Sequence, residues 1–210
     1  SSSFTTAISQ ANDAIDANSP SVTSVSIPNG ATKVGDAITV TIIGSESGLT
    51  LHTGQVNGVN VTGFTNTSGS TYIATYTVTE GNTDRAAGDD IPVSFILADA
   101  AGNISSSFTT AISQANDAID ANSPIGYTVT VDQTPVNAGN DNAVSFTFVD
   151  AEVGATYNYI FTSSGGAGSV TGSGVIATAT NQITGKNISG LSDGTITLSV
   201  TLTDTNGNAG

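Results

Sequence analysis

Most of the chemically active side chains in this sequence are carboxylates. Asp and Glu number 17 against 3 Lys and Arg, and the chain holds one histidine and no cysteine. In proteins, paired carboxylates hydrolyse glycosidic bonds, and clustered carboxylates bind hard cations. Nucleophilic catalysis by serine usually needs a neighbouring base, and His52 lies in a threonine-rich stretch that indicates an ordinary strand position. The residue types therefore favour cation binding or sugar hydrolysis.

Two acidic pairs have the composition of a hydrolytic site, Asp89 with Asp90 and Asp150 with Glu152. A hydrolase also needs a concave site for its substrate, and the sequence has no tryptophan and no insertion that would form a cleft. We therefore expect that the chain is not an enzyme and has no catalytic residue.

The acidic and amide residues gather in turns and linkers at the predicted ends of two domains. A first group belongs to an N-terminal linker and the turn beside it, and comprises Asp13, Asp16, Asn18, Asp99 and Asn103. A second group belongs to a later linker and the turns around it, and comprises Glu80, Asp84, Asp89, Asp90, Asp117, Asp120, Asn122, Asp150, Glu152 and Asp204, with Asn206 and Asn208 nearby.

Like charges that converge from several loops repel one another unless a cation lies between them. Ca²⁺ accepts about six to eight oxygen ligands in flexible geometry, whereas Mg²⁺ demands a compact octahedron. We therefore predict calcium at both groups. The alternative is that these residues occupy solvated turns, where Asp and Asn are common.

One segment of the sequence occurs twice. Ser1–Pro20 and Ser105–Pro124 both read SSSFTTAISQANDAIDANSP, which gives a period of 104 residues between the two prolines. An identical run at a fixed offset indicates tandem repeats, and this period is typical of one β-sandwich domain.

Apolar residues alternate with polar ones along most of the chain. Examples are the rows Ile38, Val40, Ile42 and Tyr72, Ala74, Tyr76, and a similar pattern restarts after Pro124. Alternation of apolar and polar residues predicts strands with one buried face. A disordered segment would not be expected to maintain this alternation. About seven short strands per repeat predict an all-β protein of tandem immunoglobulin-like β-sandwich domains.

The repeat sets the expected domain boundaries. Residues 1–20 are interpreted as the last strand and linker of a preceding repeat, residues 21–124 as a sandwich with its exit linker, and residues 125–210 as a diverged sandwich without its final strand. We hypothesise that residues 1–11 of one molecule complete the second sandwich of another, head to tail, because an open strand edge tends to pair. The alternative is a frayed end.

The second linker, Asp117-Ala-Ile-Asp120-Ala-Asn122-Ser-Pro124, resembles the calcium linker of cadherins, although its spacing differs. The near-identical repeats, the scarcity of Lys, Arg and Cys, and an Asp-x-x-Gly-Asn turn resemble the bacterial Ig-like repeats of giant type I-secreted surface adhesins. This resemblance implies a calcium-stiffened extender at the bacterial cell surface, in adhesion and biofilm formation. It implies calcium ligands at Asp117, Asp120 and Asn122, and in the first copy at Asp13, Asp16 and Asn18.

The expected function is thus a structural spacer whose partners are neighbouring repeats of the same chain. A net charge of −14 opposes binding to nucleic acid or anionic lipid, and no apolar stretch reaches the length of about 18 residues that indicates a membrane span. The alternative is a module that binds a glycan or a protein. This alternative concerns mainly the diverged second domain, because a unique binding site would not be expected in the segment that occurs twice.

Overall fold

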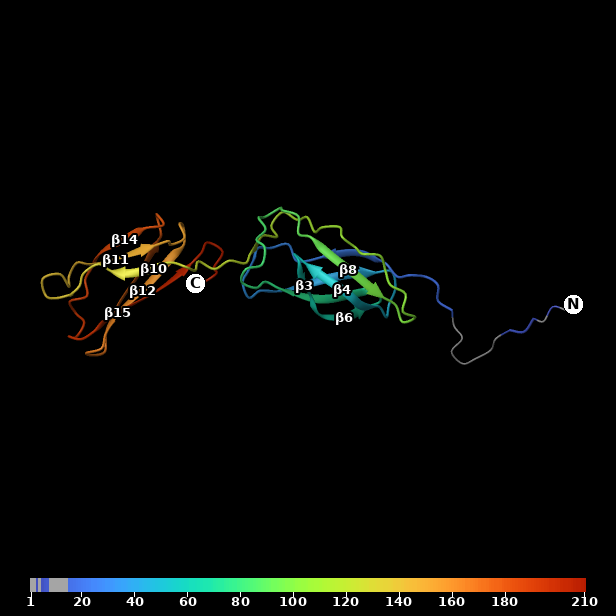
Figure 1. The fold of residues 1–210 in the computed structure, drawn as a ribbon, viewed down its shortest axis with the longest axis horizontal. Helices are drawn as coiled ribbons and strands as arrows, with labels where there is room; N and C mark the ends of the chain where they lie inside the picture. Colours follow the sequence, from blue (N-terminus) through green and yellow to red (C-terminus); the bar gives the residue numbers. More distant parts are fainter. Residues whose placement is uncertain (1–2, 4, 8–14) are drawn as a thin grey trace. The chain divides into compact units, whose positions relative to one another are not determined.

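The computed structural model describes residues 3, 5–7 and 15–210, and Figure 1 shows their fold. These residues form fifteen strands and, within the described part, no helix. They divide into two compact units. The first holds the residues up to Asn29, Ala37–Thr77 and Asp90–Gln114, and the second holds Gly30–Asp36, Val78–Asp89 and Ala115–Gly210.

The first unit consists of two antiparallel sheets with strand orders β1-β3-β7-β6 and β5-β4-β8. Their strands are β1 (Val22–Ser26), β3 (Ala37–Gly44), β4 (Thr50–Val56), β5 (Val59–Asn60), β6 (Thr62–Ser68), β7 (Thr71–Thr77) and β8 (Val93–Ala98). The segment after β8 returns along its free edge, where Phe108 pairs with Phe95 and Ile112 pairs with Ile91. This segment therefore extends the first unit's sheet β5-β4-β8 beyond β8.

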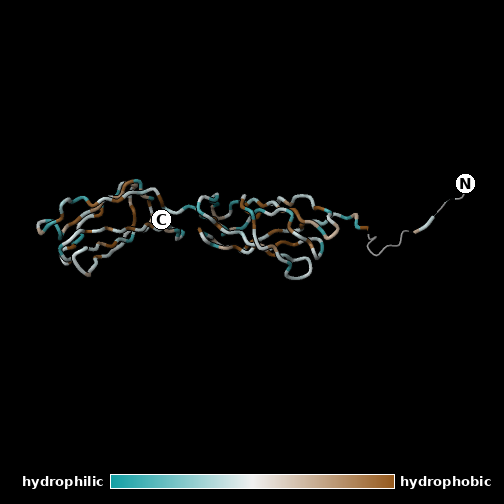
Figure 2. Tube along the Cα trace, turned by 60° about the horizontal axis from the view of Figure 1, so that its bottom comes forward, coloured by the Kyte–Doolittle hydropathy of each residue, from teal (hydrophilic) through white to brown (hydrophobic). Residues whose placement is uncertain are grey.

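The alternation in the sequence explains which face of each strand is buried. Along β3, Ile38, Val40 and Ile42 are buried, and along β7 Tyr72 and Tyr76 are fully buried. Figure 2 shows the same alternation of polar and apolar residues along the trace of each unit. The tight turn between β4 and β5 has positive φ angles at Asn57 and Gly58, which is the backbone that an Asn-Gly hairpin turn requires.

The second unit contains sheets β10-β11-β14 and β13-β12-β15 and a short parallel pair, β2-β9. Its strands are β2 (Thr32–Lys33), β9 (Ile119–Asp120), β10 (Thr128–Val131), β11 (Val144–Val149), β12 (Thr156–Ser163), β13 (Ser169–Val175), β14 (Asn181–Lys186) and β15 (Ile196–Thr203). With the first unit, this confirms the all-β fold of tandem immunoglobulin-like sandwiches.

Aromatic rings hold the two sheets of the second unit together. Phe146 on β11 is fully buried and lies 6.4, 5.3 and 5.8 Å, between ring centroids, from Tyr157, Tyr159 and Phe161 on β12. Each of these pairs is edge-to-face, the arrangement that aromatic quadrupoles favour. One side chain thus joins both layers of the core.

Some expectations about the ends of the domains are not tested by this structure. The boundaries at Pro20 and Pro124 and the strand donation by residues 1–11 stay predictions, and residues 1–2, 4 and 8–11 of that segment lie outside the described residues. Within the described part, no helix is long and apolar enough to cross a membrane.

We expect Phe146→Ala to destabilise the second unit by about 3–5 kcal/mol, because the substitution leaves a cavity where four aromatic rings meet. Urea unfolding followed by tyrosine fluorescence measures this change. The control is Val153→Ala, at a side chain that is 60% exposed, which should change the free energy of unfolding by less than about 0.5 kcal/mol. Equal effects of the two substitutions would contradict the assigned core.

Candidate functional site

The second linker is an extended segment that three other parts of the second unit hold in place. The backbone N–H and the hydroxyl of Thr32 both donate to the carbonyl of Ala118, at 2.8 and 3.1 Å. Arg85 and Ile119 exchange two backbone hydrogen bonds of 2.8 and 2.9 Å, and the N–H of Gly81 donates to Ala121. The path of the linker is therefore fixed by backbone pairing.

Two predicted ligand residues bind this linker through hydrogen bonds. Asp84 accepts from the backbone N–H of Ala121 at 2.8 Å and from the side-chain amide of Asn122 at 2.6 Å. Glu80 accepts from the backbone N–H and the hydroxyl of Ser123, with its shortest contact 2.8 Å from the hydroxyl. These two carboxylates are thus hydrogen-bonded to Ala121, Asn122 and Ser123 of the linker.

The Asp-x-x-Gly-Asn turn after β15 is a small hydrogen-bonded unit. Asp204 accepts from the backbone N–H groups of Asn206, Gly207 and Asn208, at 2.7 to 2.9 Å, and from the Asn208 side-chain amide at 2.8 Å. Burial alone would raise the pKa of Asp204, but the hydrogen bonds from Asn208 and its neighbours outweigh burial and lower that pKa below its usual value. The carboxylate is held ionised in the turn.

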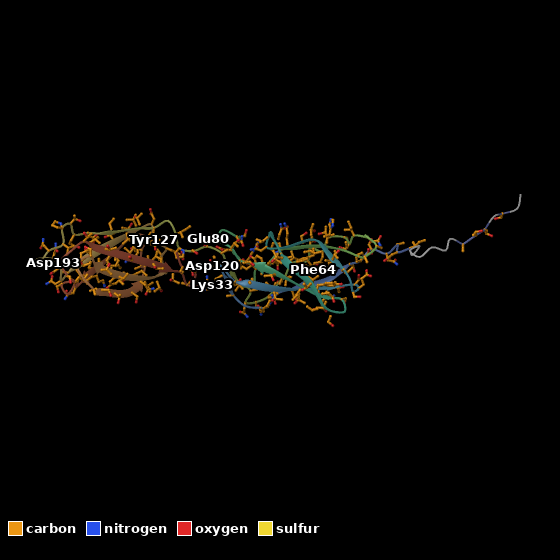
Figure 3. The ribbon with its side chains drawn as sticks, turned by 90° about the horizontal axis from the view of Figure 1, so that it is seen from below. Lys33, Phe64, Glu80, Asp120, Tyr127 and Asp193 are labelled. Carbon is orange, nitrogen blue, oxygen red and sulfur yellow. The ribbon has the colours of Figure 1, made fainter. Side chains whose placement is uncertain are left out.

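This turn contacts the linker and the segment that contains β2. The ammonium of Lys33 donates to the carbonyl of Gly207 at 2.9 Å, and the backbone N–H of Val34 donates to the Asn208 side chain at 2.8 Å. The side-chain amide of Asn206 donates to the carboxylate of Asp120. Figure 3 shows Lys33, Glu80 and Asp120 in the same region of the second unit.

A third acidic residue faces the same region. The pKa of the Glu152 carboxyl is raised, first by partial burial and then by the negative charges of Asp204 and Asp120. Three carboxylates from the linker, the loop before β12 and the turn after β15 are therefore close enough to repel one another. A hollow of about 300 Å³ beside β9, lined in part by Asp84, Asp120 and Asn206, leaves room for a ligand there.

Asp117 differs from the other predicted ligand residues that the structure describes. It is 1% exposed, and neither of its side-chain oxygens has a hydrogen-bond partner among the described residues. Burying an ionised carboxylate without a partner is strongly unfavourable, so a native structure normally supplies a donor or a cation. Of the predicted ligands that the structure describes, Asp117 is thus the one whose carboxylate oxygens are both buried and without a hydrogen-bond partner.

The first group of predicted ligands belongs to the first unit. Asp99 accepts from the side-chain amide of Asn103 at 2.8 Å, and the same amide donates to the backbone carbonyl of Asp16 at 3.2 Å. The hydrogen bond from the Asn103 side chain is the largest cause of the lowered pKa of Asp99. The carboxylate of Asp16 accepts a hydrogen bond from the backbone N–H of Asn18 at 3.1 Å. Asp13 lies outside the described residues.

Three predicted ligands remain apart from these contacts. Asp89 accepts from the backbone N–H of Ala86 in its own loop, and Asp90 and Asp150 are exposed. Among residues 3, 5–7 and 15–210, no three carboxylate, imidazole or thiol side chains are grouped closely enough to hold a metal ion by themselves. Calcium at the two groups stays a prediction.

Two side chains of the second unit, Lys33 and Asp132, make contacts that were not predicted from the sequence. Lys33 is one of 3 basic residues and touches a residue 174 positions away, which no local pattern indicates. Asp132 accepts from the side chains of Ser145 and Thr147 on β11 and of Gln182 on β14, at 2.6 to 2.9 Å. Burial alone would raise the pKa of Asp132, but these hydrogen bonds lower it.

Comparisons with known proteins give likenesses of structure. No known family model matches the chain, and no curated protein matches it. The chain is similar to a tetra-tandem repeat in the extending region of a large adhesion protein, with 20% identity and a TM-score of 0.37 over 91% of this chain and 46% of that one. It is similar to part of a 1.5-MDa bacterial ice-binding adhesin, with 19% identity and a TM-score of 0.38 over 91% of this chain and 62% of that one.

A third solved structure is a DUF4785 family protein from Legionella pneumophila, with 16% identity and a TM-score of 0.34 over 87% of this chain and 52% of that one. Two of the three are large adhesins, the class of protein that the sequence resembles. The chain covers less than two thirds of each.

We expect Asn208→Ala, in chelator, to destabilise the second unit at neutral pH by about 1–3 kcal/mol, because Asp204 loses a charge-assisted hydrogen bond. The lowered pKa of Asp204 means that its contribution is present above its unfolded-state pKa of about 3.9 and is lost as the pH falls through the lower folded-state pKa. The difference between the wild type and Asn208→Ala should therefore shrink below about pH 4. Urea unfolding across this pH range measures it, and a difference independent of pH would contradict the assignment.

Proposed function

We propose that this chain is a non-enzymatic spacer segment of a bacterial surface adhesin, and that Ca²⁺ stiffens its linkers. The supporting features belong to the chain itself: an identical linker sequence in two copies, two sandwich units, and an acidic surplus concentrated at turns and linkers. A spacer needs many similar rigid units, and repetition with small sandwiches provides them. Its place outside the bacterial cell belongs to the same proposal.

The buried carboxylate of Asp117 is the observation that carries the calcium part of the proposal. Both of its oxygens lack a hydrogen-bond partner among the described residues, and the side chain is 1% exposed. A bound Ca²⁺ would supply the missing positive charge, because calcium prefers carboxylate oxygens and accepts irregular geometry.

Other oxygen-bearing residues of the second unit lie along the same linker, and calcium binding would have to draw them toward Asp117, because as they stand no three carboxylates of the described residues form a cluster. Asp84, Asp120 and Glu80 contribute carboxylate oxygens along the linker, and the side-chain carbonyl of Asn122 is a neutral oxygen donor. Their hydrogen bonds hold the linker in one extended path, so the oxygens are partly preorganised. Bound calcium would also offset the repulsion among Asp120, Glu152 and Asp204 that raises the pKa of Glu152.

The mechanical consequence follows from electrostatics. Without a bound metal ion, the carboxylates on the linker and on the loops around it repel one another, and hydrogen bonds and the single ammonium of Lys33 oppose that repulsion. With calcium, the same carboxylates become ligands of one centre and restrain the linker. The chain would therefore be more extended and harder to unfold when calcium is bound.

We expect millimolar Ca²⁺ to raise the melting temperature of the chain and to narrow the distribution of its dimensions in solution, relative to excess chelator. Differential scanning calorimetry and small-angle X-ray scattering measure these two changes. Mg²⁺ at the same concentration is the control and should have a smaller effect, because it keeps its hydration waters and demands octahedral geometry. An unchanged melting temperature and maximum dimension would rule out calcium stiffening.

Asp117→Asn provides a sharper test. In chelator, this variant should be at least as stable as the wild type, because it removes a buried charge that has no partner. In calcium, it should lose most of the stabilisation that the wild type gains, since it removes an anionic ligand. Asp193→Asn is the matched control, because Asp193 is exposed in the same unit and belongs to neither predicted ligand group, and it should respond to calcium as the wild type does. Isothermal calorimetry on all three proteins compares their affinities, and equal calcium responses would contradict the role of Asp117.

A further inference from the structure

The second unit has a distinctive surface on the outer face of sheet β13-β12-β15. Because strand side chains alternate, Tyr157, Tyr159 and Phe161 point into the core while the residues between them point outward. The strand register places Asn158 between Ser173 and Thr201, and Ile160 between Thr171 and Ser199. These two rows, which we call the outer rows, lie side by side on the sheet.

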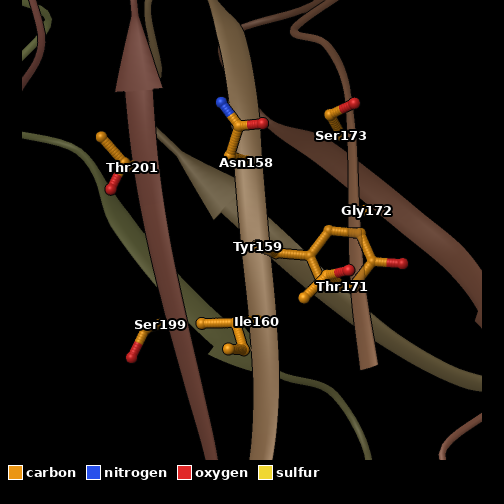
Figure 4. A pocket seen from close by; sticks show the side chains of 8 residues that line it. All are labelled: Asn158, Tyr159, Ile160, Thr171, Gly172, Ser173, Ser199 and Thr201. Carbon is orange, nitrogen blue, oxygen red and sulfur yellow. The ribbon is translucent and has the colours of Figure 1, made fainter. Parts of the chain in front are cut away.

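The outer rows line a hollow of about 480 Å³, which Figure 4 shows from close by. Gly172 lies between Thr171 and Ser173 and has no side chain, and the ring of Tyr159 occupies the place where its Cβ would be, within 2.6 to 2.7 Å. The absence of a side chain in the middle of β13 therefore follows from the packing of the core. The volume falls within the range of about 300–1,000 Å³ typical of small-ligand sites.

The polar groups of the outer rows are not used inside the protein. Among the described residues, no hydrogen bond involves the side chains of Asn158, Thr171, Ser173, Ser199 or Thr201, and all five are exposed. The corresponding three-stranded sheet of the first unit is different. There the Thr50 hydroxyl donates to the carbonyl of Ala98, and the side chains of Ser94 and Ser107 bond to each other at 3.3 Å. Four hydroxyls and one side-chain amide of the outer rows are therefore available for hydrogen bonds with a ligand.

The chemistry of the hollow narrows the class of ligand. None of its lining residues is charged, although the chain carries a net charge of −14. An ionic ligand would find no counter-charge there, whereas a neutral polyhydroxylated ligand would find both donors and acceptors. Ile160 is 37% exposed at the centre of the rows and offers an aliphatic surface for the C–H groups of such a ligand.

We propose that the outer face of sheet β13-β12-β15 is a binding site for a neutral oligosaccharide. Asn158 and Thr201 form one polar row with Ser173, and these groups exchange hydrogen bonds with sugar hydroxyls. Ile160 packs against an apolar patch of the sugar ring. This activity is additional to the spacer role and needs neither calcium nor the linker.

The test uses the whole 210-residue chain in chelator. An array of neutral, sialylated and sulfated oligosaccharides identifies bound sugars, and calorimetry or NMR titration measures their dissociation constants. We expect binding to neutral members only, with backbone shifts concentrated in β12, β13 and β15. The double variant Asn158→Ala, Thr201→Ala should weaken binding at least about tenfold, since it removes two hydrogen-bonding side chains.

The matched control is Thr156→Ala, Thr197→Ala, which changes the same two strands on exposed positions outside the hollow. It should bind as the wild type does. If the Asn158, Thr201 variant melts at a lower temperature than the control, Ser173→Ala, Ser199→Ala replaces it. The proposal is overturned by binding of charged sugars only, by binding that the variants leave unchanged, or by the absence of binding to every neutral sugar on the array.

Discussion

The acidic surplus of this chain is the constraint on which its turns and linkers depend. With 17 carboxylates and 3 basic side chains, ion pairs can satisfy only a few acids. Backbone N–H groups and side-chain amides take the place of lysine and arginine. Asp99 with Asn103 and Asp204 with Asn208 use the same arrangement, in which one asparagine donates from both its backbone and its side chain.

The twenty-residue repeat serves both units of the structure. In the second copy, the first part pairs with Phe95 of β8 through Phe108 and with Ile91 through Ile112. Its second part, from Ala115 onward, belongs to the second unit and pairs with Thr32 and Arg85. Residues 105–114 therefore pair within the first unit, and the residues that follow, from Ala115, form hydrogen bonds within the second unit.

The core of the second unit also shapes its outer surface. The rings of Tyr157 and Tyr159 lie across Gly174 and Gly172 of β13, at distances that exclude any side chain at those glycines. Aromatic packing on the inner face thus requires glycine at two positions of β13, and the hollow on the outer face is lined in part by Gly172 and its neighbours Thr171 and Ser173. In the three-stranded sheet of the first unit, by contrast, the hydroxyls of Thr50, Ser94 and Ser107 form hydrogen bonds within the protein.

Local patterns in the sequence determined a large part of this protein. Period-two alternation predicted the buried rows of β3 and β7, because a strand has only two faces. The Asp-x-x-Gly-Asn turns were recognisable because Asp204 and Asn208 bond within five residues. Tertiary structure decided what local patterns cannot encode: the contact of Lys33 with Gly207, the burial of Asp117, and the alignment of Asn158 with Ser173 and Thr201. Each depends on strands or loops that are distant in the chain, and their register and approach are fixed only when the two sheets pack.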